Sequence, residues 1–140
     1  MLFREPTADI EQRAVARLRG DSRLEVSGPA GYVPGVYAGE GWFALWLGRA
    51  VVAMDPAGTA MRYETDNDVV GVARWGGGWL VIDELTVEVR SDDLLGEISR
   101  HDHPEVIVGW SIDAMKLSIV DFNQLRIHLD TRLRSVDHAP

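Results

Sequence analysis

The chain of 140 residues contains no cysteine. That absence excludes a disulfide framework, a thiolate metal site and a cysteine nucleophile. The sequence also lacks any run approaching the ~18 apolar residues that a membrane-spanning helix needs. The segment after Met1 has no apolar stretch long enough for a signal peptide. We therefore expect a cytoplasmic protein that makes no contact with a membrane.

Basic side chains are few, with 14 Lys and Arg against 22 Asp and Glu and a net charge of −8. Binding to nucleic acid needs clustered Lys and Arg, so that class of partner is excluded. Residues 55–121 contain fourteen acidic and five basic side chains, a net charge of −9, so the two ends are nearly neutral. Such a segment attracts a basic partner. The alternative is a solvated acidic face that keeps the protein in solution.

Apolar residues make up 46% of the chain, a composition typical of globular proteins, and the length fits a single domain over residues 1–140. Residues 41–90 show the period of two that is typical of strands. Trp42 and Trp46 fall on one face and Phe43 and Leu45 on the other, which predicts a strand covered on both sides.

A hairpin is predicted where Trp75 and Trp79 flank three glycines, and we expect both rings to be exposed at its tip, where they could meet across the strands. The apolar phase then slips by one residue. That slip predicts a bulge at Asp83 and Glu84 rather than a tight turn.

Three helices are expected from caps and apolar spacing. The first begins near Thr7 and ends near Gly20, a short one lies near 92–101 after Ser91, and the last lies near 122–136 after Asp121. The stripes that predict the first and last helices are Ile10, Ala14 and Leu18, and Phe122, Leu125, Leu129, Leu133 and Val136. The predicted fold is therefore α+β, an antiparallel β-sheet meander of about six to eight strands with these helices.

Chemical motifs are scarce. His101 and His103 would point the same way on a strand and suit a metal, but no third ligand lies at a suitable spacing. No nucleophile elbow, phosphate-binding loop or calcium loop is present. The sequence therefore predicts no catalytic residue, no metal site and no cofactor.

The remaining features favour a binding surface. A small, acidic, cysteine-free chain resembles the bacterial immunity proteins of toxin systems, a likeness of type that assigns no residue. The resemblance implies an inhibitor that blocks a basic partner, such as a toxin or a nuclease-like enzyme, by steric and electrostatic occlusion. The expected partner-binding residues are Glu64, Asp66, Asp68, Trp75, Trp79, Asp83, Glu84, Asp92 and Asp93.

Two alternatives remain open. One is a small-molecule-binding or enzymatic domain, with a Trp-lined pocket and Asp83 or Glu84 as acid or base. The other is a structural component that acts only through oligomer contacts.

Overall fold

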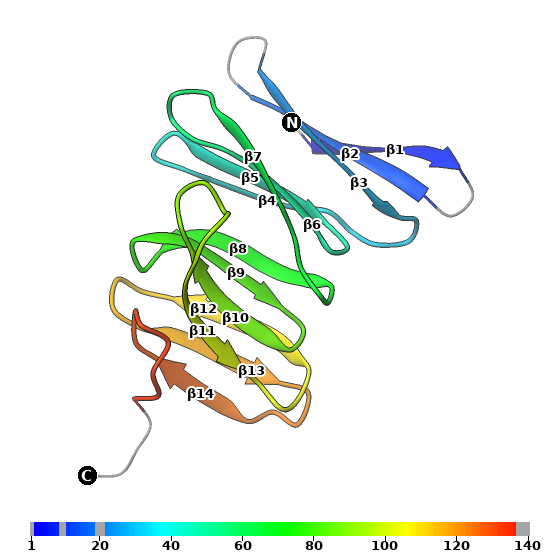
Figure 1. Cartoon of the computed structure of the whole chain (residues 1–140). Coiled ribbons are helices and arrows are strands. Elements are labelled where there is room, and N and C mark those ends of the chain that lie inside the picture. Colours follow the sequence, from blue (N-terminus) through cyan, green and yellow to red (C-terminus); the bar gives the residue numbers. More distant parts are fainter. Residues whose placement is uncertain (1, 9–10, 19–21, 137–140) are drawn as a thin grey trace.

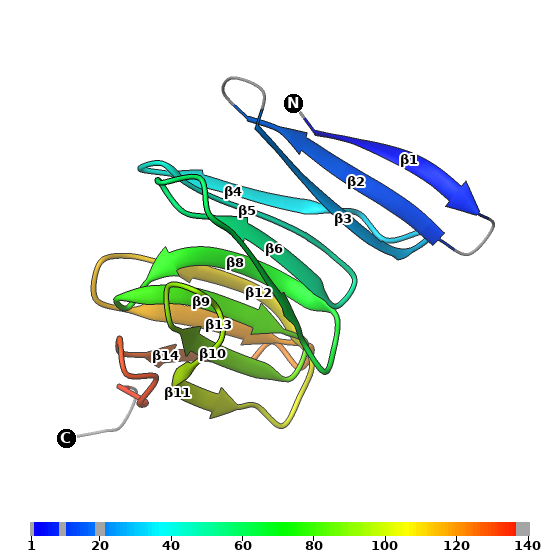
Figure 2. The ribbon, with the colours of Figure 1, turned by 45° about the horizontal axis from the view of Figure 1, so that its top comes forward.

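The computed structural model of this chain describes residues 2–8, 11–18 and 22–136. Every regular element in these residues is a β-strand, and the predicted α+β class is wrong. Because the described residues contain no helix, they contain none that is long and apolar enough to cross a membrane. The strands form four antiparallel sheets that stack as layers (Figures 1 and 2).

Each sheet is a meander in which neighbouring strands follow one another along the chain. The first sheet contains β1 (Leu2–Ala8), β2 (Glu11–Arg17) and β3 (Arg23–Pro29). The second contains β4 (Gly35–Gly39), β5 (Trp42–Leu47), β6 (Ala50–Met54) and β7 (Ala60–Glu64). The third contains β8 (Val69–Trp75), β9 (Gly78–Asp83), β10 (Thr86–Arg90) and β11 (Glu97–Asp102). The fourth contains β12 (Ile107–Ile112), β13 (Leu117–Asp121) and β14 (Arg126–Leu129).

Three apolar cores separate the four sheets. The core between the first and second sheets consists of Ala14, Ala16, Leu24, Val26, Leu45, Leu47 and Ala50. The core between the second and third consists of Ala44, Val51, Ala53, Val72, Trp79, Val81 and Leu94. The core between the third and fourth consists of Trp75, Leu80, Ile82, Val87, Val89, Ile107, Leu117, Ile119, Leu129 and Leu133. The second and third sheets are therefore covered on both faces.

The double coverage predicted for residues 42–47 is confirmed. In β5, Leu45 and Leu47 face the first sheet, whereas Ala44 faces the third. Strand β9 has the same property, because all of its residues are buried. An apolar run without polar alternation is what a strand in the middle of such a stack requires.

The predicted N-terminal helix is replaced by β1 and β2, although part of its pattern, Asp9, Ile10 and Gly20, lies outside the described residues. Strand β2 is the central strand of its sheet, and Ala14, Val15 and Ala16 are all at most 4% exposed. Three consecutive buried residues fit a central strand as well as they fit a helix. Pairing on both edges overrides the helical preference of alanine.

The predicted helix near 92–101 is a loop followed by β11. Leu94 is fully buried with a φ of 68°, a left-handed conformation that a helix cannot accommodate. The Ser91 hydroxyl accepts a hydrogen bond from the Gly96 amide at 2.9 Å, so Ser91 caps a loop and not a helix.

The predicted C-terminal helix near 122–136 is a turn, strand β14 and a further turn. The Asp121 carboxylate accepts hydrogen bonds from the Asn123 and Leu125 amides, as it would at a helix start. However, Gln124 has a φ of 65°, and the Asp121 amide donates to the Leu125 carbonyl at 3.1 Å. These two features close a hairpin between β13 and β14.

The predicted bulge at Asp83 and Glu84 is instead the turn of the β9–β10 hairpin, with Val87 paired to Ile82. The turn explains the change of apolar phase, because each strand begins its own alternation. A register shift does occur nearby, on the neighbouring strand β8 between Val69 and Gly71.

Candidate functional site

Trp75 and Trp79 flank the predicted hairpin, which is confirmed between β8 and β9 with Gly76 and Gly77 at positive φ. Their predicted exposure is wrong, because Trp75 is 7% exposed and Trp79 is fully buried. The two rings lie on opposite faces of the sheet, in different cores, and so do not meet across the strands. Both rings are unavailable as surface anchors.

Both indole nitrogens are satisfied within the fold. Trp75 Nε1 donates to the Asp113 carbonyl at 2.7 Å, and Trp79 Nε1 donates to the Asp92 carbonyl at 3.1 Å. These bonds fasten loops to the ends of the sheets, which is a structural role.

Asp83 is also buried, at 2% exposure. Its Oδ1 accepts hydrogen bonds from the amides of Leu85 at 2.9 Å and Thr86 at 2.7 Å. Asp83 therefore caps the β9–β10 turn and presents no free carboxylate to a partner.

Asp92 and Asp93 are exposed, but they lie in the β10–β11 loop, at the far end of the sheets from the other predicted acids. Asp92 forms an ion pair at 2.8 Å with Arg74, whose guanidinium stacks 3.7 Å above the Trp42 ring. The Ser91 hydroxyl and the Leu95 amide donate to Asp93 and lower its pKa.

The other predicted acids, Glu64, Asp66, Asp68 and Glu84, gather at one end of the sheets. The turns there, which we call the turn ladder, comprise residues 48–49, 65–68, 84–85, 103–106 and 122–125. Backbone hydrogen bonds join them in series: Thr65 N to Arg49 O at 2.8 Å, Val69 N to Gly48 O at 2.7 Å, Glu84 N to Asp68 O at 3.1 Å, His103 N to Leu85 O at 2.8 Å, Ile107 N to Glu84 O at 2.7 Å and Phe122 N to Val106 O at 2.7 Å. The ladder thus ties the second, third and fourth sheets together.

Carboxylates predominate on the turn ladder. Glu64, at its border, and Asp66 and Glu105, on it, are exposed, whereas Asp68 and Glu84 are half-buried. Arg49 lies 3.9 Å from Asp68, and Arg126 follows the last turn.

The turn ladder also carries apolar side chains that sequence reasoning missed. Val106 is 37% exposed, Phe122 is 73% exposed and Leu125 is 57% exposed. Phe122 and Leu125 matched the buried stripe of a predicted helix, so their exposure was hidden by the wrong element. The available signal was Asp121 with Asn123, since Asp and Asn are also typical of turns.

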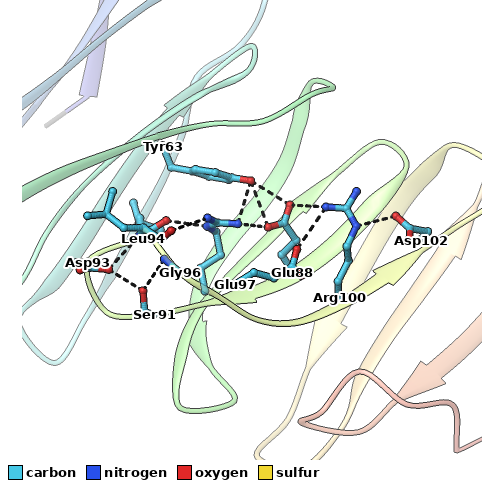
Figure 3. A network of polar contacts seen from close by, with 11 residues as sticks. Tyr63, Glu88, Ser91, Asp93, Leu94, Gly96, Glu97, Arg100 and Asp102 are labelled. Atoms are coloured by element: carbon cyan, nitrogen blue, oxygen red, sulfur yellow. Dashed lines mark hydrogen bonds and ion pairs between the residues drawn. The ribbon is translucent and has the colours of Figure 1, made fainter.

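A polar network joins the second and third sheets (Figure 3). Glu88 and Arg90 form a buried ion pair on β10, and the Tyr63 hydroxyl on β7 donates to the Glu88 carboxylate at 3.1 Å. Arg90 also donates to the Leu94 carbonyl at 2.7 Å and stacks 3.9 Å from the Tyr63 ring centroid. Burial and the Glu88 charge raise the pKa of Tyr63 to about 12, against the opposing effect of Arg90. Every charge here is paired, so this network is structural.

A chain of hydrogen bonds links His101, His103 and Asp121. His103 Nε2 lies 3.0 Å from Asp121 Oδ2, and His103 Nδ1 lies 3.1 Å from His101 Nε2. The bond from His103 lowers the pKa of Asp121. Burial, with a smaller effect of His103, lowers the pKa of His101 below its usual 6.5. The described residues contain no cluster of three or more His, Cys, Asp or Glu side chains arranged to ligate a metal.

An open groove of about 820 Å³ lies between the first and second sheets. Its lining is mainly apolar and includes Leu18, Val36, Phe43 and Met54, with Arg17 and Asp55 among the polar members. No described tryptophan lines it, so it differs from the Trp-lined pocket of the small-molecule alternative.

Comparison of the chain with models of protein families and with curated proteins gives no match in either case.

Proposed function

We propose that this chain is an immunity-type inhibitor, a cytoplasmic protein that blocks a basic toxin or enzyme by occupying its cleft. The observation that carries the proposal is the gathering of Glu64, Asp66, Asp68 and Glu84 along one end of the stacked sheets. Glu64, Asp66 and Asp68 lie at the end of β7 and in the connection that follows it, and Glu84 lies in the β9–β10 turn. Their concentration at one end favours a surface that faces a positively charged partner.

Rigidity of this surface supports the proposal. The turns that carry the acids are linked by backbone hydrogen bonds of 2.7–3.1 Å, so little conformational entropy remains to be lost on binding. A preformed acidic surface is suited to occlusion, because it needs no rearrangement when the partner arrives.

The test is co-expression with the product of the adjacent reading frame, followed by co-purification and kinetic binding measurements. We expect a complex whose association rate falls steeply as salt is added, because the acidic surface steers the encounter. A neighbouring product that is toxic alone and harmless with this chain would establish the inhibitor function. Absence of a complex, or a complex that is insensitive to salt, would refute this mechanism.

Charge reversal locates the surface. The double variant Glu64→Lys and Asp66→Lys should slow association by about tenfold, because rim charges act mainly on the encounter rate. The control for position is Glu40→Lys, a single charge reversal at an exposed turn between β4 and β5, at the opposite end of the sheets. Equal effects of the double variant and the control, after correction for net charge, would exclude the turn ladder as the binding surface.

A further inference from the structure

Val106, Phe122 and Leu125 form an exposed apolar group on the turn ladder, which we call the apolar trio. The Phe122 amide donates to the Val106 carbonyl at 2.7 Å, and the Asp121 amide donates to the Leu125 carbonyl at 3.1 Å. Phe122 is 73% exposed, more than any other aromatic side chain whose exposure the structure describes. An exposed aromatic ring beside two aliphatic side chains is a typical feature of protein interfaces.

The buried side chain of Asp121 fixes the turn that carries Phe122 and Leu125. Asp121 is 2% exposed, and its Oδ1 accepts hydrogen bonds from the Asn123 amide at 2.9 Å and the Leu125 amide at 3.0 Å. Its Oδ2 lies 3.0 Å from His103 Nε2, on the loop that carries Val106. The two loops that supply the trio are therefore fixed to each other by both side-chain and backbone bonds, so the trio is preformed for binding.

Acidic residues border the trio. Glu105 precedes Val106 and is exposed, and the Glu84 carbonyl accepts a hydrogen bond from the Ile107 amide at 2.7 Å. The trio thus lies on the same end of the molecule as the acids of the proposed inhibitory surface. Apolar contact at the centre with charged groups around it is the arrangement that gives both affinity and specificity.

We propose that the apolar trio, with Phe122 at its centre, is the anchor by which this chain binds a partner whose contact surface carries apolar side chains ringed by Lys or Arg. This inference rests on the proposed function and names the part of the surface that supplies most of the affinity. The acids bring the partner to the surface, and the trio retains it. Removal of Phe122 therefore accelerates dissociation, whereas removal of acids slows association.

Charge selects a basic protein over two other occupants. A symmetric dimer of this chain would bring Glu84 and Glu105 of both copies to the same interface, where the two carboxylates of each copy outnumber its exposed Arg126 and the net charges repel. An anionic membrane surface would be repelled by the same carboxylates.

The probe for the test is a synthetic peptide with Leu-Trp-Leu between two Arg-Lys clusters, compared with a charge-matched peptide that has Ser-Ser-Ser at its centre. Binding is followed by amide chemical shifts in NMR titrations of the full chain. We expect the apolar peptide to bind at least about tenfold more tightly than the serine peptide, with shift changes at residues 105–107 and 122–125.

Phe122→Ala should remove this preference, so that both peptides bind with equal and weak affinity. The control is Met115→Ala, because Met115 is 72% exposed in the β12–β13 turn, and that turn is closed by Asp113 in the way that Asp121 closes its own. The control should keep the full preference for the apolar peptide.

Three results would overturn the inference: equal affinity of the wild-type chain for both peptides, shift changes away from the trio, or no binding of the apolar peptide. Self-association of the wild-type chain through these residues in sedimentation experiments would also overturn it. If both peptides bind equally to the acids, the proposed inhibitory function stands and only the anchor is refuted. Failure of the inhibitory function itself is decided separately, by the co-purification experiment.

Discussion

Glu88 and Arg90 lie two residues apart on β10, and both point toward the second sheet. Their side chains are 5% and 11% exposed, and the Tyr63 hydroxyl contacts both of them. Such a pair contributes little to stability relative to an apolar pair, but each partner makes the burial of the other tolerable. Loss of one partner leaves a buried charge without compensation.

Replacement of one partner tests this account. Glu88→Leu should lower the free energy of unfolding by about 3 kcal/mol. Arg90 then keeps its hydrogen bond to the Leu94 carbonyl but loses the carboxylate that balances its charge. Tyr63→Phe is the milder control and should cost about 1 kcal/mol, the contribution of a hydroxyl hydrogen bond. Both values are measured by urea unfolding near neutral pH. Equal losses in the two variants would show that charge compensation is unimportant here.

Tyr63 also makes stability dependent on alkaline pH. Its pKa is raised from 10.0 to about 12 by burial first and by Glu88 second. In the unfolded chain the hydroxyl ionises near pH 10, so its contribution is complete below that pH and is lost as pH rises toward 12. Urea unfolding across this range should show a steeper decline for the wild type than for Tyr63→Phe. Parallel declines would mean that Tyr63 ionises normally in the folded chain.

Aspartates that close turns recur among the elements. The carboxylates of Asp113, Asp121 and Asp130 each accept hydrogen bonds from two backbone amides of the residues that follow. Each of these carboxyl groups has a pKa below the usual 3.8. Hydrogen bonds to the charged form are the cause, led by His103 at Asp121 and by backbone amides at the other two. Part of the acidic excess of residues 55–121 is therefore structural.

Turn closure by Asp130 predicts sensitivity to acid. A lowered pKa in the folded state gives stability that is present above about pH 4 and is lost as pH falls through the folded-state pKa. Asp130→Asn keeps an acceptor oxygen without the charge, so its unfolding free energy should fall less between pH 6 and pH 3 than that of the wild type. Urea unfolding at both pH values gives this difference. If the free energy of unfolding falls equally in the wild type and in Asp130→Asn, the acid sensitivity belongs to other carboxylates.

These turns also explain which elements the sequence could predict. Strands β5 to β9 lie within residues 41–90, where the period of two predicted strands. Leu125, Leu129 and Leu133 are spaced four residues apart, as on one face of a helix. The same spacing occurs here in a turn, the end of the short strand β14 and a second turn. The spacing predicted that all three would be buried on one face of a helix. Leu129 and Leu133 are buried, Leu125 is exposed, and none of the three lies in a helix. Local spacing cannot distinguish these cases, because Gln124 at positive φ decides between them.

The candidate surface was predictable only in part. Charge along the chain indicated an acidic region, but separation of Asp92 and Asp93 from Glu64, Asp66 and Glu84 depends on which end of a sheet each turn occupies. Successive turns of an antiparallel meander alternate between the two ends of the sheet, so the end at which a turn lies follows only from the number of strands before it. Burial of Trp75 and Trp79 required knowledge that a sheet packs on each side of their hairpin.

At the scale of the whole molecule, the described core residues of each sheet pack against the neighbouring sheets of the stack, so stability is distributed in layers. The two inner sheets are covered on both faces, whereas the described core residues of the first sheet pack against the second sheet. Regions with fewer buried contacts open first in native-state hydrogen exchange. We expect slow exchange in β9 and β10 and faster exchange in β2 and β3.

A pair of core substitutions tests whether the layers open independently. Leu24→Ala removes a side chain from the core between the first and second sheets, at a cost of about 2–5 kcal/mol, and should accelerate exchange in β2 and β3 alone. Leu80→Ala opens the core between the third and fourth sheets and should accelerate exchange in β9, β10 and β13. Uniform acceleration throughout the chain by Leu24→Ala would contradict layered opening, because it would mean that all four sheets unfold as one cooperative unit.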